Sequence, residues 1–399
     1  MLRGQMPAPG VQAFALIAGI EALVRGATLS VFPLVMYRAW GSAAVVSEIY
    51  FAVGLMSLLM ALTVPMLTRR FSRRTVYLCA IALYVVGAGF GMASGRWATL
   101  ALLCNATAAA SAFVCFNAYV LDHVDKQDFG RLESLRMFYG GAGWVAGPTL
   151  SVWLMSSWSG APFALVALAG STMFLMVWRM RLGDGRQMHS ARPRANHPVA
   201  NLLRFAAQPR LVAGWFLALA RSCGWWFYFV YIGIFAVENG LGDKVGGVAA
   251  SIANMGLFVA PLMLRWMQKR SVRKAVRTGT LNAAACFVAG TLLWWLPWAA
   301  VGIIVFGTLF LVLLDVCANL PFMMAVKPSE RTEMAAVYSS FRDASGILSP
   351  ALAWVVLQFV PVAGVFAAGG GMLLAAWAVG GRLHPQLGVP GAQRVRARR

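Results

Sequence analysis

Six ionisable side chains interrupt the long apolar stretches of this sequence, and they are the residues whose types could do chemistry there. An arginine can bind an anionic group through its planar guanidinium, and a carboxylate can take up and release a proton. In an apolar interior each charge is costly unless it is paired or hydrated. The same six could therefore be internal salt bridges, and both interpretations stay open for each of them. They are Glu21, Arg25, Arg221, Asp315, Arg342 and Asp343.

The spacing of these residues follows the period of a helix. Glu21 precedes Arg25 by four residues, the favourable order for a pair on one helix face. Asp315 and Asn319 are again four apart. Glu21 is the first candidate for carrying a proton, although a pair with Arg25 would keep it ionised. The predicted proton-coupling residues are Glu21, Asp315 and Asp343. The predicted substrate-binding residues are Arg25, Asn117, Arg221, Tyr228, Asp315, Asn319 and Arg342.

The elements that must position these residues follow from composition. The 399 residues are 60% apolar and only 12% charged, with a mean hydropathy of +0.70. A soluble domain could not bury so much apolar surface. A membrane crossing needs about 20 apolar residues and must be helical, because lipid offers an open backbone no hydrogen bonds. We predict twelve spans, approximately at 11–37, 43–66, 75–94, 97–122, 136–157, 161–178, 211–237, 246–267, 278–297, 299–324, 335–359 and 361–381.

One long polar segment, 182–208, divides the apolar sequence into two similar lengths. It carries four arginines, and its prolines Pro193 and Pro198 discourage regular structure. The predicted organisation is an N-terminal six-helix bundle over 1–181, a basic cytoplasmic linker over 182–208, and a C-terminal six-helix bundle with a basic tail over 209–399.

The net charge of +21 could suggest a nucleic-acid partner, but its distribution favours a membrane. If the N-terminus is cytoplasmic, Arg38, Arg96 and Lys244 are the only basic connector residues on the opposite side. This asymmetry is typical of multi-pass membrane proteins, and basic connectors attract anionic lipid headgroups. We therefore expect a bacterial inner-membrane protein with both termini cytoplasmic, the lipid bilayer as its surroundings and no nucleic-acid partner.

Catalytic and cofactor motifs are lacking. The six cysteines lie in apolar segments without CxxC spacing, the four histidines are scattered, and no GxxxxGK[ST] loop is present. We expect no metal, no cofactor and no enzymatic activity, so transport energy must come from a gradient. A membrane enzyme would gather carboxylates and histidines at one membrane face. A transporter-like sensor or a lipid flippase would keep the same architecture and stays an alternative.

An internal repeat supports two equivalent halves. A shift of 202 residues aligns Pro148 with Pro350 and Asn117 with Asn319. Six-helix halves of this kind are the units from which secondary transporters are built.

Two motifs carry a resemblance to a known family. The segment 65–74, PMLTRRFSRR, is similar to the loop between helices 2 and 3 of the major facilitator superfamily, Gly-x-Leu-x-Asp-Arg-x-Gly-Arg-Arg, with Arg69 in place of the Asp. The run that ends in Gly147-Pro148 resembles the antiporter pattern of the fifth helix. The matching residues are Leu67, Arg70, Arg73 and Arg74 in the first motif and Gly140, Gly143, Gly147 and Pro148 in the second.

The resemblance covers the whole chain in architecture and implies a fold of two pseudo-symmetric six-helix bundles. In this family helices 3, 6, 9 and 12 face lipid, and helices 1, 4, 7 and 10 line a central cavity. The expected function is secondary active transport of a small solute by alternating access. It implies a gating or conformational role for Arg70, Arg73, Arg74, Gly143, Gly147 and Pro148, although small residues also serve helix packing.

The antiporter pattern favours export, by proton-coupled antiport, of a small organic or drug-like molecule. An importer, symporter or facilitator of an organic anion is the alternative. We expect a monomer whose partners are its small-molecule substrate and protons.

Overall fold

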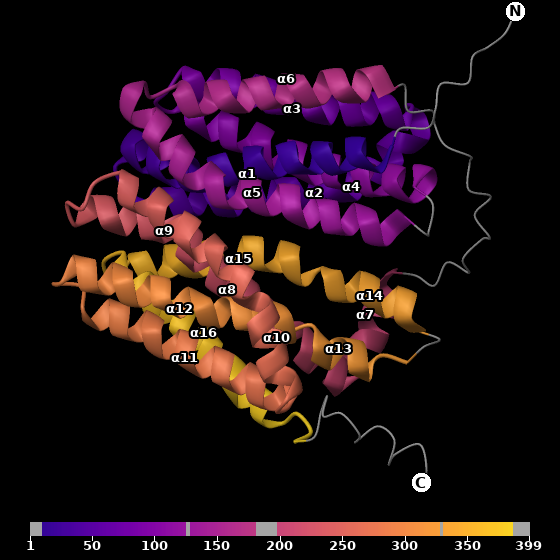
Figure 1. The fold of residues 1–399 in the computed structure, drawn as a ribbon. Helices are drawn as coiled ribbons and strands as arrows, with labels where there is room; N and C mark the ends of the chain where they lie inside the picture. The colour runs from indigo at the N-terminus through magenta and orange to yellow at the C-terminus, as the bar shows by residue number, and fades with distance from the viewer. Residues whose placement is uncertain (1–9, 125–127, 181–197, 328–329, 386–399) are drawn as a thin grey trace, which may run out of the picture. The chain divides into compact units, whose positions relative to one another are not determined.

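The computed structural model describes residues 10–124, 128–180, 198–327 and 330–385, and the regular elements in these ranges are all helices (Figure 1). In the described residues, nine helical stretches are long and apolar enough to cross a membrane. The predicted all-helical membrane fold is confirmed. The count of twelve spans stays a prediction, because the predicted spans 136–157, 278–297 and 335–359 are not among these nine stretches.

The chain forms two compact units. The N-terminal unit comprises Met1–Gly41 and Ala52–Ala191, and the C-terminal unit comprises Ser42–Phe51 and Arg192–Arg399. The short segment at the start of the second helix belongs to the C-terminal unit, where the Ser47 hydroxyl lies 2.7 Å from the Tyr231 hydroxyl. The first six helices are α1 Val11–Trp40, α2 Ala43–Arg70, α3 Arg73–Met92, α4 Trp97–His123, α5 Phe129–Ser157 and α6 Ala161–Met180.

Helices α1 and α5 pack backbone against backbone. A Cβ atom placed on Gly143 would lie 2.7 Å from the Leu23 amide nitrogen, and one on Gly147 would lie 2.7 Å from that of Ala27. A Cβ on Gly26 would lie 2.6 Å from the Gly143 carbonyl oxygen. No side chain fits at these three positions, so close packing of α1 on α5 explains why they are glycines. The gating role predicted for Gly143, Gly147 and Pro148 stays a prediction.

The basic loop between α2 and α3 is fixed within the N-terminal unit. Ser72 caps α3 by accepting a hydrogen bond from the Thr75 amide, 3.1 Å away. Arg73 forms an ion pair with Asp122 near the end of α4. Arg74 donates to the Trp178 carbonyl in α6 over 2.8 Å. The two arginines therefore tie α3 to both of its neighbours.

The C-terminal unit contains more, and shorter, helices. They are α7 Pro198–Ala206, α8 Pro209–Glu238, α9 Lys244–Met255, the 3-10 helix η2 Gly256–Val259, α10 Ala260–Gln268, α11 Val272–Leu292, α12 Pro297–Cys317, α13 Leu320–Ala325, α14 Arg331–Ser339, α15 Phe341–Leu357 and α16 Ala363–Gly381.

Three of the spans predicted as continuous helices in this unit are segmented. The span 246–267 is divided into α9, η2 and α10, with Pro261 in the first turn of α10. The span 299–324 breaks before Pro321, which lacks an amide donor and whose ring clashes with the preceding turn. The span 335–359 breaks at Ser340, whose hydroxyl donates to the Val337 carbonyl over 2.7 Å and so competes with the helical backbone bonds.

The predicted linker ends in a helix. Residues 182–197 lie outside the described residues, but Pro198–Ala206 forms α7. The sequence predicts that Pro198 discourages regular structure, but this residue occupies the first position of α7, where its missing amide costs little.

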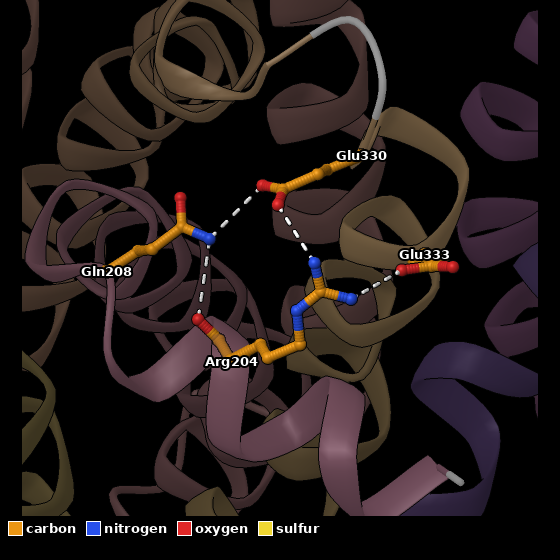
Figure 2. A network of polar contacts seen from close by, with 4 residues as sticks. All are labelled: Arg204, Gln208, Glu330 and Glu333. Atoms are coloured by element: carbon orange, nitrogen blue, oxygen red, sulfur yellow. Dashed lines mark hydrogen bonds and ion pairs between the residues drawn. The ribbon is translucent and has the colours of Figure 1, made fainter. Parts of the chain in front are cut away.

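A polar network anchors α7 to the start of α14 (Figure 2). Arg204 forms ion pairs with Glu330 at 3.1 Å and with Glu333 at 3.3 Å. The Gln208 amide donates to the second carboxylate oxygen of Glu330 over 3.3 Å. In Figure 2 the Arg204 guanidinium lies between the two glutamates. This network holds the end of the predicted linker on the C-terminal unit.

Candidate functional site

The best-defined polar cluster is an ion pair between α8 and α12. The Arg221 guanidinium lies 3.1 Å from Asp315 Oδ1. The Trp225 indole, one turn along α8, donates to Asp315 Oδ2 over 3.0 Å. The side chains of Arg221 and Asp315 are 12% and 30% exposed. Both oxygens of the carboxylate are thus engaged within the C-terminal unit.

Arg221 keeps donor capacity beyond this ion pair. Its Nε is buried and has no hydrogen-bond partner among the described residues. Its guanidinium carbon lies 5.4 Å from the centre of the Phe341 ring, and that of Arg342 lies 5.8 Å from the same ring. Two arginines therefore lie against this ring, Arg221 paired with Asp315 and Arg342 acted on electrostatically by Asp343. The unsatisfied Nε of Arg221 is the donor that suits an anionic group.

Helix breaks surround this cluster. Tyr338, in the last turn of α14, donates its hydroxyl to Asn319 Oδ1 over 2.8 Å. Asn319 itself precedes the first residue of α13. The hydroxyls of Ser222 and Ser345 lie 2.7 Å apart. Discontinuous membrane helices are a common setting for binding sites in secondary transporters, because the break leaves backbone groups open to a ligand.

A second polar group lies inside the N-terminal unit around Glu21. This residue is 8% exposed, and its Oε1 has no hydrogen-bond partner among the described residues. The predicted pair with Arg25 is not present in the described part of the chain. The Arg25 side chain is exposed and lies 5.5 Å from the Trp144 ring of α5. Its cation–π contact takes the place of the ion pair that the spacing favoured.

Two tyrosines of α3 accompany Glu21. Tyr77 and Tyr84 are fully buried, and their hydroxyls also find no partner among the described residues. Both tyrosines interact electrostatically with Glu21, and so do Arg25 and, more weakly, Arg136 of α5. Buried polar groups are nearly always hydrogen-bonded to protein or water. A carboxylate accompanied by two such hydroxyls is therefore suited to hold water and to pass a proton.

Four further predicted site residues lie outside the two clusters or at their edge. Tyr228 is buried and donates to the Ala249 carbonyl over 2.7 Å, so its hydroxyl serves the packing of α8 on α9. Asn117 bonds to the Phe113 carbonyl of its own helix over 2.8 Å. Asp343 is exposed in the first turn of α15, and Arg70 is exposed at the end of α2. Asn117 and Arg70 join neither cluster by a described contact. The Tyr228 ring packs edge-on against Trp225 at 6.2 Å, and Asp343 interacts electrostatically with Arg342. The functional roles of all four residues stay predictions.

Tyr77 and Tyr84 were not among the site residues predicted from the sequence. The family resemblance implies that the third span faces lipid, and it carries no charge in its interior. The available signal was the spacing of Tyr77 and Tyr84, which are seven residues apart and thus share one helix face. Trp225 was visible only as one member of an aromatic run, and its bond to Asp315 depends on the packing of α8 against α12.

Comparison with solved structures shows the fold. The nucleoside transporter NupG superposes with a TM-score of 0.70 at 11% identity, covering 94% of this chain and 99% of that chain. A bacterial homolog of the human lysosomal transporter Spinster, in its inward-facing and occupied conformation, gives a TM-score of 0.64 at 15% identity, covering 92% and 93%. No curated protein sequence matches the chain.

The sequence itself matches the Major Facilitator Superfamily over residues 14–350. The match spans both units and includes both motifs from which we inferred the resemblance. This chain belongs to the major facilitator superfamily, and it is an integral multi-pass membrane transporter rather than an enzyme.

Proposed function

We propose that this transporter moves a small organic anion and that Arg221 binds the anionic group. The observation that carries the proposal is the buried Nε of Arg221, a charged donor without an acceptor among the described residues. A buried donor left unsatisfied costs about 1–3 kcal/mol, and more for a charged group. A carboxylate or phosphate of the substrate would satisfy it, and the nearby Phe341 and Trp225 rings would contact an apolar portion.

A drug-like cation is the less favoured substrate. A cation would need a carboxylate with free oxygens, but Asp315 already accepts from Arg221 and from the Trp225 indole. Asp343, the other nearby carboxylate, interacts electrostatically with Arg342, which lies beside the same Phe341 ring.

Glu21 is the proposed proton-coupling residue. It is buried, and within the described residues it makes no ion pair at contact distance with Arg25, which acts on it only through the longer-range electrostatic interaction. An unpaired charge in an apolar interior is expensive, so a group that exchanges a proton suits this position. The hydroxyls of Tyr77 and Tyr84 could bind the water through which the proton arrives. Asp315, already engaged by two donors, is the weaker candidate of the two.

The proposal also includes the direction of transport and the membrane in which the protein lies. Export in exchange for protons is the direction that the sequence favours. It stays a prediction, because close packing on α1 already accounts for Gly143 and Gly147. We further propose a bacterial inner membrane, cytoplasmic termini and a monomer, on the distribution of basic residues along the chain.

The proposal on substrate charge is tested by ligand-dependent stability. A ligand that binds only the folded protein raises its melting temperature. The purified protein would be heated with benzoate, with benzylamine and with uridine, the last because NupG is a nucleoside transporter. We expect stabilisation by benzoate, lost in Arg221→Gln and Arg342→Gln and kept in Arg265→Gln. Arg265 is a matched control, since it lies on α10 and contacts neither cluster.

Flux in proteoliposomes completes the test. Stabilisation by benzylamine alone would refute the anion proposal, and stabilisation by uridine alone would favour a neutral substrate. Binding of benzoate without flux would favour the sensor alternative. For coupling, Glu21→Gln should retain exchange of labelled for unlabelled benzoate but lose accumulation driven by a pH gradient. Loss of both in a folded variant would contradict the role given to Glu21.

A further inference from the structure

A groove at one end of the C-terminal unit combines basic rims with apolar walls. It lies between the end of α7, the start of α8, α13 and the end of α16, and its volume is about 1000 Å³. Arg210, Arg273 and Arg382 line it together with His384, and none of its described lining residues is acidic. Its walls are apolar side chains and include Trp215, Phe216, Met324 and Leu383.

A smaller groove of about 340 Å³ continues the basic surface along α11. It shares Arg273 with the first groove and adds Lys274 and Arg277, again without an acidic residue among its described lining residues. The Arg277 guanidinium carbon lies 4.4 Å from the Trp377 ring. The Nε of Arg277 is buried and has no partner among the described residues. The cationic surface is therefore not neutralised by acidic side chains lining these grooves.

The grooves lie where this unit would meet the lipid headgroups. Helices α8 and α11 begin there and α16 ends there, so the basic residues sit at the ends of apolar helices. Beside them, α7 exposes Leu202 and Leu203, while its Phe205 is buried 6.3 Å from the Phe322 ring. A short helix with exposed leucines at such a boundary is typical of an interfacial helix.

We propose that these grooves bind an anionic phospholipid of the bilayer. The phosphate would lie between Arg210, Arg273 and Arg382, and an acyl chain would follow the apolar wall of Trp215 and Phe216. Basic pockets between membrane helices bind lipid headgroups, and guanidinium groups match phosphate in geometry. A zwitterionic lipid would leave the excess of positive charge unbalanced.

Other occupants fit these grooves less well. The C-terminal residues Arg394, Arg396, Arg398 and Arg399 carry the same sign of charge as the groove, so like-charge repulsion disfavours them as its occupant. A soluble organic anion would satisfy the arginines but would leave the apolar walls of the larger groove uncovered. A phospholipid matches both the rim and the walls.

The test compares lipids in mixed micelles with the purified full-length protein. Dioleoyl phosphatidylglycerol and dioleoyl phosphatidylcholine would be titrated, and the melting temperature and the lipid adducts seen by native mass spectrometry would be recorded. We expect stabilisation and retained adducts with phosphatidylglycerol only. Each arginine near a headgroup contributes about fivefold in affinity. Arg382→Gln should thus weaken binding about fivefold, and the variant with Arg210→Gln, Arg273→Gln and Arg382→Gln about a hundredfold.

Controls separate the proposal from general charge effects. Arg265→Gln and Lys269→Gln remove basic residues outside the grooves and should retain phosphatidylglycerol binding. Arg382 follows the last residue of α16, so its removal leaves the helix packing intact. Equal binding of both lipids, or unchanged binding in the triple variant, would overturn the proposal. Glycerol phosphate that stabilises the protein as strongly as phosphatidylglycerol would assign the grooves to a soluble anion instead.

Discussion

Substitution of Gly143 by alanine should destabilise the N-terminal unit by separating α1 from α5. The new Cβ would lie 2.7 Å from the Leu23 nitrogen, whereas ordinary contact begins at 3.4 Å. The two helices must therefore move apart by about 0.7 Å, the difference between these distances. A gap of about 0.5–1 Å removes a quarter to a half of the dispersion energy of each contact it opens. Overpacking of this kind costs about 1–3 kcal/mol.

Gly141 offers a matched control on the same helix. A Cβ there would meet nothing within 4 Å. Both substitutions gain the same helix propensity, about 0.8–1.0 kcal/mol, so this gain cancels when the two variants are compared. We expect Gly141→Ala to melt at or above the unmodified protein. Gly143→Ala should melt below Gly141→Ala by about 2–6 °C, taking about 2 °C per kcal/mol.

The measurement is the thermal unfolding of both purified variants in the same detergent. Equal melting temperatures for Gly141→Ala and Gly143→Ala would refute the packing argument. In that case α1 would have to accommodate the methyl group without loss of contact, and the glycine at 143 would need an explanation other than close approach.

Three further ion pairs give predictions that stability measurements can check. A double-mutant cycle on Arg221→Gln and Asp315→Asn should show a coupling energy of about 0.5–3 kcal/mol, and a coupling near zero would exclude a direct pair. Arg73→Asp should reduce stability, because it places two carboxylates together. A second change, Asp122→Arg, should restore part of the stability by reversing the ion pair. If the second change restored nothing, a direct contact between the two side chains would be contradicted. Arg204→Gln should cost no more than about 1 kcal/mol, since the Arg204 side chain is 48% exposed. That loss should shrink in high salt, and a loss that is independent of salt would contradict an ionic contact.

The fold was largely predictable from the sequence, because a bilayer leaves few choices to an apolar chain. Length and hydropathy indicate the helices, and the two motifs indicate the family. The segmentation of the C-terminal helices was harder to predict. Pro321 is a visible signal for a break, but Pro33 and Pro148 lie inside helices that continue through them. Whether a proline interrupts a helix depends on the neighbours that satisfy the freed backbone groups.

The candidate site was only partly predictable. The depth of Arg221 and Asp315 in their spans marked both as important, but their direct contact depends on how α8 packs on α12. The spacing of Glu21 and Arg25 favours an ion pair, but the described residues contain only a longer-range electrostatic interaction between them. Arg25 instead lies over Trp144, a residue on another helix that a pattern within one helix cannot anticipate. Local spacing predicts which residues share a face, and tertiary packing decides which of them meet.

The breaks in the C-terminal helices make the two units mechanically unequal. Helices α1 to α6 run without interruption in the described residues, although Pro33 in α1 and Pro148 in α5 each lack an amide donor. Bending one of these helices strains a backbone ladder that is otherwise continuous. The breaks at Gly256–Val259, before Pro321 and at Ser340 lack part of that ladder. They therefore act as soft points at which bending costs little. In a transport cycle we expect the helices of the N-terminal unit to move as rigid bodies and those of the C-terminal unit to bend at their breaks. Two of the three breaks lie beside the residues proposed to bind the substrate.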